Sequence, residues 1–319
     1  MTEALTLWYG LGWPLCRLLF FVAIGILLGN FIEALNWTRH VARLARPLVR
    51  LGHLSQITGA SFSMAFFSGI ASNTMLAEAY DQETLSRREL VLANLFNSLP
   101  RYFLHLPTVF FLTAPLIGAA AFHYVGITLA AALFQTMAVV FLGRLLLGGP
   151  AAAFPAAATE ATAAEVTPAQ ALDKAWQRFR KRFRRVLCYT APVYILFYLL
   201  NRFGVFHDIQ QFIAMHLAFL SWLKPQAMGV VVLHVTAEFT AGLAAAGVLL
   251  DQSSLSVRDV VLALMAGNVL STPMRAVRHQ FPYYAGIFRP RLAVTLIVYS
   301  QGFRVAAIAM ATSIYLVLM

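Results

Sequence analysis

The sequence predicts an all-α integral membrane protein built from two inverted-topology repeats. Three observations support this fold class: an apolar composition, an internal sequence repeat, and polar interruptions at matching places in the two copies. Of the 319 residues, 60% are hydrophobic and only 12% are charged, and the mean hydropathy is +0.72. Too few polar side chains remain to cover a water-soluble surface. We therefore expect a protein that lies within a lipid bilayer.

The internal repeat is a short segment that returns 170 positions later in the chain. Residues 81–93, DQETLSRRELVLA, match residues 251–263, DQSSLSVRDVVLA. At nearly the same offset, Asn97 corresponds to Asn268 and Ser68 to Glu238. A shared ancestral segment explains these matches better than chance, so we expect the duplication to cover almost the whole chain. Because each copy is expected to cross the membrane three times, the two copies enter from opposite sides.

The first repeat, residues 1–148, is expected to contain, in order, a span (14–35), an interfacial helix (37–53), a re-entrant hairpin (54–80), a broken helix (86–118) and a final span (122–147). The hairpin is rich in Ser, Thr and Gly, which suits burial in protein better than contact with lipid. The broken helix is too long for one straight crossing and contains Asn97-Ser98-Leu99-Pro100. Proline removes a backbone donor, so we expect two half-helices there.

The second repeat, residues 186–319, is expected to contain the same order: a span (186–200), an interfacial segment (207–223), a hairpin (226–250), a broken helix (256–288) and a final span (292–319). Its break is expected at 268–273, which ends in Thr272-Pro273. Residues 149–185 are expected to form a linker between the repeats, first rich in Ala and Pro and then strongly basic.

The distribution of Lys and Arg predicts the orientation in the membrane. With the N-terminus outside, the basic linker and most loop arginines lie in the cytoplasm, and only Arg202, Lys224 and Arg258 fall outside. We expect a multi-pass protein of the plasma (inner) membrane. The net charge of +11 is concentrated beside apolar segments, so we expect the basic residues to face the lipid bilayer rather than nucleic acid.

The hairpin tips and the helix breaks are expected to meet near the middle of the membrane. Broken helices expose backbone N–H and C=O groups there, and side-chain amides and hydroxyls complete a polar pocket. The candidate solute-binding residues are Ser68, Asn73, Asn97, Ser98, Arg101, Glu238, Thr240, Asn268, Ser271 and Arg275. The alternative role of the asparagines is helix capping beside a proline, and that of the hydroxyl residues is packing between helices.

Ionisable residues at bilayer depth are costly, and they therefore mark functional positions. Glu238 is the only charged residue in 230–250 and is expected to take up a proton, a cation or a solute hydroxyl, with pairing to an arginine as the alternative. His105 and His279 join it as candidates for ion or proton coupling. Four arginines are expected at bilayer depth: Arg101, Arg275, Arg278 and Arg304. Because Glu238 is the only acid expected there, a surplus of three positive charges remains, which favours an anionic solute.

The segments SGIASN (68–73) and NSLPRY (97–102) resemble the Gate, or nucleoside recognition, family. Its relatives include concentrative nucleoside transporters, the membrane part of ferrous-iron transporter B and spore maturation proteins. The resemblance implies solute contacts at both hairpin tips, 68–73 and 236–242, and at the two helix breaks. The chain departs from nucleoside carriers, which have acidic residues at both tips, because its only acid there is Glu238. It departs from the iron transporters in its surplus of deep arginine.

No nucleophile elbow, metal-ligand cluster or glycine-rich phosphate loop occurs in the sequence, so we expect no enzymatic activity, cofactor or metal. We expect a secondary transporter that moves a small polar, anionic solute by alternating access. One alternative is a non-transporting membrane subunit that acts with a partner protein, and another is a nucleoside or metal-ion permease. A homo-oligomer or a paired membrane subunit is compatible with each of these functions.

Overall fold

The computed structural model describes residues 5, 7–13, 15–17, 19–20, 23–24, 27, 31, 45–147, 167–203, 223–236 and 239–318. Every regular element in this part of the chain is a helix, which confirms the predicted all-α class. Two of these helices are long and apolar enough to cross a membrane: α8 (Ala120–Leu146) and α16 (Pro290–Leu318). Most of the predicted first span, 14–35, and of the interfacial segment 207–223 lies outside the described residues.

The first half contains a short π-helix, η1 (Trp8–Gly12), and then α3 (Ala45–Leu51), α4 (Gln56–Ala65), α5 (Gly69–Asp81), α6 (Arg87–Phe96), α7 (Ser98–Ile117) and α8. Helices α4 and α5 occupy the range of the predicted hairpin. Ser68 begins α5, because its Oγ accepts a hydrogen bond from the Ala71 N–H at 3.2 Å. Helices α6 and α7 are separated at Asn97, where the sequence predicts the first helix break.

The second half contains α9 (Pro168–Arg202), α11 (Pro225–Thr236), α12 (Phe239–Asp251), α13 (Val257–Leu270), α14 (Thr272–Arg275), the π-helix η5 (Ala276–Gln280), α15 (Phe281–Ala285) and α16. The segment 256–288, predicted as one helix with a single break, thus forms four short helices: α13, α14, η5 and α15. Pro273 and Pro282 account for the additional breaks, because a proline lacks the backbone N–H donor. The basic end of the predicted linker is helical and continues without interruption into the predicted span as α9. Good helix-forming residues fill this segment.

The two copies of the repeated sequence have the same local structure. After α5 the chain turns through Glu83, and after α12 it turns through Ser253, and these two residues have similar left-handed φ angles of 59° and 54°. The next helix begins in the same way in both copies. The hydroxyls of Ser86 and Ser256 each accept the N–H of the residue three positions later, both at 3.2 Å.

In both copies, an acidic residue in the first turn of the helix after the hairpin contacts the residue just before the hairpin. Glu89 of α6 accepts a hydrogen bond from the backbone N–H of Ser55, just before α4, at 2.7 Å. Asp259 of α13 forms an ion pair of 2.6 Å with Lys224, just before α11. The two segments therefore share sequence, turn geometry and contact position. The inverted repeat of the whole chain stays a prediction.

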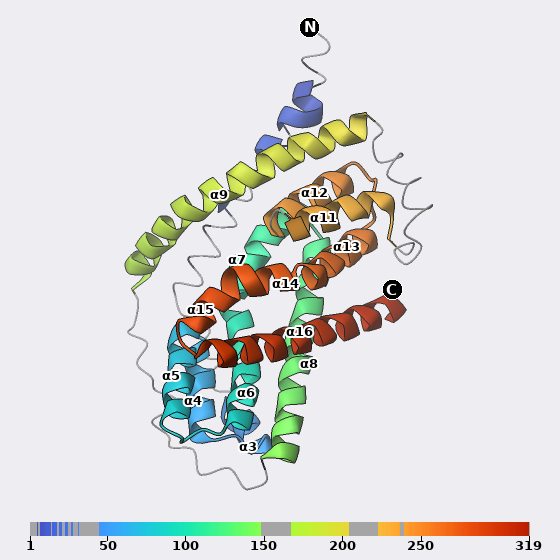
Figure 1. The fold of residues 1–319 in the computed structure, drawn as a ribbon. Helices are drawn as coiled ribbons and strands as arrows, with labels where there is room; N and C mark the ends of the chain where they lie inside the picture. Colours follow the sequence, from blue (N-terminus) through green and yellow to red (C-terminus); the bar gives the residue numbers. More distant parts are fainter. Residues whose placement is uncertain are drawn as a thin grey trace.

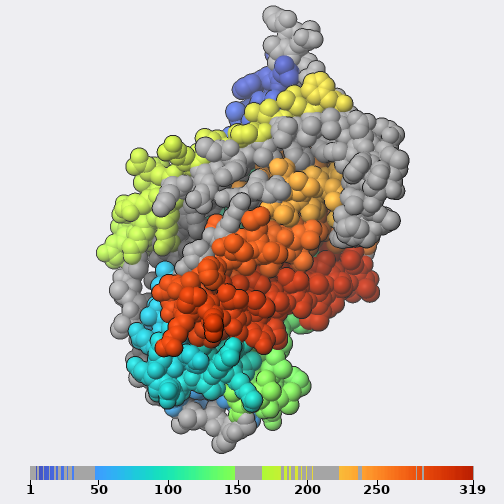
Figure 2. Space-filling model, in the orientation of Figure 1, coloured from blue at the N-terminus to red at the C-terminus, as the bar shows by residue number. Residues whose placement is uncertain are grey.

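The two helical hairpins lie at opposite ends of the molecule (Figure 1). The α4/α5 pair is at the lower end, the α11/α12 pair is toward the upper end, and α7 and α8 run between the two ends. Helix α16 packs across α8. In the same orientation, the surface formed by 272–318 crosses the middle of this face as a continuous band (Figure 2). Residues from both halves of the sequence therefore meet at the centre.

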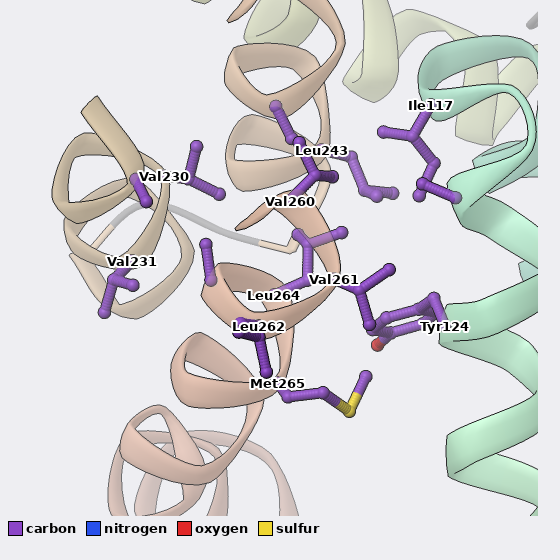
Figure 3. Packing of buried hydrophobic residues seen from close by; sticks show 14 of the residues in the cluster. Ile117, Tyr124, Val230, Val231, Leu243, Val260, Val261, Leu262, Leu264 and Met265 are labelled. Atoms are coloured by element: carbon purple, nitrogen blue, oxygen red, sulfur yellow. The ribbon is translucent and has the colours of Figure 1, made fainter. Parts of the chain in front are cut away.

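The largest apolar core joins the end of α7 and the start of α8 to helices α11, α12 and α13. Figure 3 shows side chains of α13 packed between α11 on one side and α7 and α8 on the other. Leu243, Val260 and Val261 are fully buried there. A Cβ atom at Gly247 of α12 would collide with the carbonyl oxygen of Leu116 in α7. The glycine thus allows these two helices to approach closely.

Candidate functional site

A cavity of about 400 Å³ lies where the helices of the two halves meet. Its size is in the range of small-molecule sites. Helix α7 contributes Ser98, Arg101, Tyr102, His105, Leu106 and Val109, a spacing that places them on one helix face. Helix α8 contributes Tyr124, Thr128, Ala131, Ala132 and Gln135. Helix α16 contributes Ser300, Gln301, Arg304 and Ile308. The remaining lining residues are Asn94, Asn268, Gln280 and Tyr284.

One group of polar side chains in the cavity is the first triad, which we define as Asn94, Arg101 and Tyr284. The Arg101 guanidinium donates to the Tyr284 hydroxyl at 3.0 Å and to the Asn94 carbonyl at 2.7 Å. The Asn94 amide donates to the same hydroxyl at 3.1 Å. Because Tyr284 belongs to α15, this triad joins the first half of the chain to the second.

The second triad, which we define as Asn268, Tyr124 and Arg304, contains the same three residue types. The Asn268 amide donates to the Tyr124 hydroxyl at 3.2 Å. Its Oδ1 accepts a hydrogen bond from Arg304 at 3.2 Å. In this triad the asparagine belongs to the second half of the chain and the tyrosine to the first. In the first triad the asparagine belongs to the first half and the tyrosine to the second.

The helix breaks place an arginine at the carbonyl end of each preceding helix. Arg101 donates to the carbonyl of Asn94, seven residues earlier, and to that of Asn97 at 2.9 Å. Arg275 likewise donates to the carbonyl of Asn268, seven residues earlier, at 2.8 Å. The C-terminal end of a helix carries unsatisfied carbonyl groups and partial negative charge, which favour a cation. This local chemistry orients both guanidinium groups.

The charge of the cavity is positive among the residues that the structure describes. Arg101 and Arg304 line it, and none of the described lining residues is acidic. Asn268 Oδ1 also accepts a hydrogen bond from Arg275 at 2.9 Å, so two guanidinium groups share one neutral oxygen. Like charges that converge in a poorly solvated site repel each other strongly. An anionic group in the cavity relieves that repulsion.

Two buried polar atoms of the lining have no hydrogen-bond partner in the described part of the chain. These atoms are Ser98 Oγ and Gln301 Oε1. Buried polar atoms nearly always have partners in folded proteins. Ser98 and Gln301 therefore place two polar atoms without partners beside the cavity.

Four of the predicted solute-binding and coupling residues line the cavity: Ser98, Arg101, His105 and Asn268. Arg304, one of the predicted deep cations, lines it as well. Three other predicted residues do not line the cavity but form hydrogen bonds with residues that do. Asn73 Oδ1 accepts from the Asn94 amide at 3.3 Å, Ser271 donates to the Asn268 carbonyl at 3.2 Å, and Arg275 donates to the same residue.

Three further predicted residues lie away from the lining. Asn97 is fully buried, and its amide donates to the hydroxyls of Ser61 and Ser72. Ser68 is the N-cap of α5, and Thr240 lies in the first turn of α12 with its hydroxyl buried.

His279 is exposed on η5 and does not line the cavity. The predicted coupling residue Glu238 lies outside the described residues, and the side chain of Arg278 is also outside them.

Sequence reasoning missed most polar residues of the lining, among them Asn94, Tyr124, Gln135 and Tyr284. A signal for two of them was present, because Tyr124, Thr128 and Gln135 share one face of an otherwise apolar span. Asn94 stands one turn before the predicted break, and Tyr284 follows Pro282. Neither position carries a pattern that separates it from ordinary packing. Among the described residues, no group of three or more His, Cys, Asp or Glu is placed to hold a metal ion.

No protein family model and no solved structure matches the chain. Two relatives come from Methanocaldococcus jannaschii. The chain is 24% identical over 303 residues to the uncharacterized protein MJ0871, which covers 94% of this chain and 91% of that protein. It is 21% identical over 304 residues to the uncharacterized protein MJ1556, which covers 92% of each. The chain thus has distant relatives over nearly its whole length, and no family is named by them.

Proposed function

We propose that this protein is a secondary membrane transporter of a small anionic solute that works by alternating access. The observation that carries the proposal is one cavity of about 400 Å³, lined by Arg101 and Arg304, with no acidic residue among its described lining. A cavity that concentrates positive charge raises the local concentration of anions and orients them. The residues of both triads supply further hydrogen-bond donors.

The arrangement of the helices is suited to alternating access. Transporters with inverted repeats place their site between the repeats, at broken helices, and move one part against another. Here the Asn94–Tyr284 and Asn268–Tyr124 bonds each join one half of the chain to the other. We expect a relative movement of the halves to break these two hydrogen bonds and to shift the apolar core that α7 and α8 share with α11, α12 and α13. The resemblance to the Gate family, read from the sequence, supports the same proposal.

The membrane placement belongs to the same proposal. We infer a multi-pass protein of the inner membrane with its N-terminus outside and the basic segment 174–185 in the cytoplasm. The apolar helices α8 and α16 support a membrane location. Glu238, together with His105 and His279, remains the predicted group for ion or proton coupling.

Ligand binding and uptake test the proposal directly. Purified protein is screened by thermal unfolding against organic anions, nucleosides and divalent metal ions, because a specific ligand raises the unfolding temperature. The bound compound is then tested for uptake into proteoliposomes. We expect an organic anion to bind and to be transported, and Asn268→Ala and Glu238→Gln to lower uptake at normal expression. Stabilisation by a nucleoside or a metal ion alone would instead favour a permease for that compound.

A second candidate is a non-transporting subunit that acts with a partner protein. Helix α9 favours it, since Lys174, Arg180 and Arg184 are exposed along its N-terminal half. Reversal of these charges to Glu, followed by affinity purification from membranes, tests this function. Loss of a specific co-purifying protein, with solute uptake absent from the wild type as well, favours the subunit. Uptake by the purified wild-type protein alone rules it out.

A further inference from the structure

We propose that the solute carries two acidic groups joined by a largely apolar body, and that each triad holds one of those groups. This inference rests on the proposed function and names the class of solute. The triads contain the same residue types, Asn, Tyr and Arg, and all six residues line the same cavity. A solute with acidic groups at both ends matches this pair of sites.

The first triad has donors left for one acidic group. A guanidinium carries five N–H donors, and the described residues accept three hydrogen bonds from Arg101: at the Asn97 carbonyl, the Asn94 carbonyl and the Tyr284 hydroxyl. These contacts hold the guanidinium plane in one orientation. The remaining N–H groups of Arg101, which lines the cavity, can bind the oxygens of a carboxylate or a phosphate.

The second triad has more unused donors. Arg304 donates one hydrogen bond to the described residues, to Asn268 Oδ1. The Tyr124 hydroxyl accepts from the Asn268 amide, and the described residues provide no acceptor for its own proton. A guanidinium and a phenol proton that both lack acceptors form a donor set for a second acidic group.

The walls of the cavity suit an uncharged body between the two acidic groups. Ala131 and Ala132 of α8 leave room beside the helix backbone, and Leu106, Val109 and Ile308 are apolar. The cavity of about 400 Å³ is also much larger than an inorganic anion requires, since a water molecule occupies about 30 Å³ in the liquid. A small ion would leave most of the wall without contacts.

Calorimetric titration with straight-chain acids tests the inference on the wild-type protein. Dicarboxylates of increasing length are each compared with the monocarboxylate of the same number of carbons. We expect one chain length at which the dicarboxylate binds about tenfold or more tightly than its matched monocarboxylate. If every dicarboxylate binds within about twofold of its monocarboxylate, the two-site inference is overturned and the anion transporter proposal stands. If neither kind of acid binds, both are overturned.

Arginine variants test whether the two triads provide the discrimination. Arg304→Gln is expected to reduce the preference for the dicarboxylate to less than about twofold, because only one charged contact remains. Arg101→Gln is expected to do the same, so if one of the two variants does not fold, the other still tests the inference. Arg144→Gln, an exposed position at the end of α8, is the control and keeps the preference. A tenfold preference that survives Arg304→Gln overturns the inference.

Discussion

Asn97, at the break between α6 and α7, illustrates how one buried amide fixes several helices. It has no exposed surface, and its Nδ2 donates to Ser61 at 2.7 Å and to Ser72 at 2.8 Å. We expect Asn97→Ala to lower the free energy of unfolding by about 1–3 kcal/mol, because both hydrogen bonds are lost. Chemical unfolding in mixed micelles measures the change. Ser98→Ala is the control: its hydroxyl has no described partner, and an equal loss there would contradict the argument.

The Tyr124 hydroxyl offers a residue-scale test of the cavity chemistry. Tyr124→Phe keeps the ring, which stacks on Phe239 with centroids 5.5 Å apart, and removes only the oxygen. We expect solute affinity to fall about tenfold, the value of one hydrogen bond to a charged group, and stability to fall by about 1 kcal/mol because the Asn268 amide loses its acceptor. Tyr102→Phe is the matched control, since the Tyr102 hydroxyl already donates to the Val125 carbonyl at 2.9 Å. A similar loss of affinity in both variants would argue against a specific contact.

The site could be predicted from the sequence only where a residue interrupts an apolar segment. Ser98, Arg101 and Asn268 stand at such interruptions, and they line the cavity. Asn94 and Tyr284 could not be found in this way, because they are 190 positions apart and only the tertiary packing brings them together. Asn97 showed the same signal as Asn268, yet its amide donates to Ser61 and Ser72 and it does not line the cavity. An amide beside a helix break therefore does not reveal which way its side chain points.

At the scale of the helix, close approach depends on single glycines. A Cβ at Gly247 would collide with the Leu116 carbonyl oxygen, so Gly247→Ala must push α12 away from α7. We expect a loss of about 1–3 kcal/mol in unfolding free energy, typical of overpacking. Gly126→Ala on α8 meets no atom within 4 Å and is expected to be neutral or slightly stabilising, because alanine favours the helix. Unfolding of the two variants in parallel provides the comparison.

The start of α13 should give a pH dependence of stability. Burial raises the pKa of the Asp259 carboxyl, but hydrogen bonds from Lys224 and Ser256 outweigh it and lower the pKa below its usual value. A lowered pKa in the folded state stabilises the fold above about pH 4, and this contribution is lost as the pH falls through the folded-state value. We expect the stability difference between the wild type and Asp259→Asn to shrink on acidification from about pH 7 to about pH 3. A difference that stays constant with pH would contradict this origin.

The helices themselves were largely predictable, because periodicity and proline placement are local properties. The separation of α6 from α7 at Asn97 follows from the nearby Pro100, and the apolar stretches predict α8 and α16. The continuity of α9 was not predicted, since the change from a basic to an apolar composition at residue 186 looks like a boundary in the sequence. The helix backbone continues through it because no glycine or proline interrupts 170–190.

At the scale of the whole molecule, the proposed mechanism depends on the two hairpins facing opposite sides of a membrane. Asp81 ends α5 and Asp251 ends α12, both are exposed, and their hairpins lie at opposite ends of the molecule (Figure 1). With Cys16 and Cys188 replaced by serine, Asp81→Cys and Asp251→Cys are labelled by an impermeant maleimide in cells and in inverted vesicles. We expect each cysteine to react from one side only, and the two from opposite sides.

The buried neighbours supply the control for this experiment. Leu85 and Leu255 lie 170 positions apart, as the two aspartates do, and are only 2% and 3% exposed. Leu85→Cys and Leu255→Cys should therefore react slowly from either side, which excludes labelling of unfolded protein. If Asp81→Cys and Asp251→Cys react from the same side, the halves are not inverted. The proposed movement of two inverted halves around the shared cavity would then be wrong.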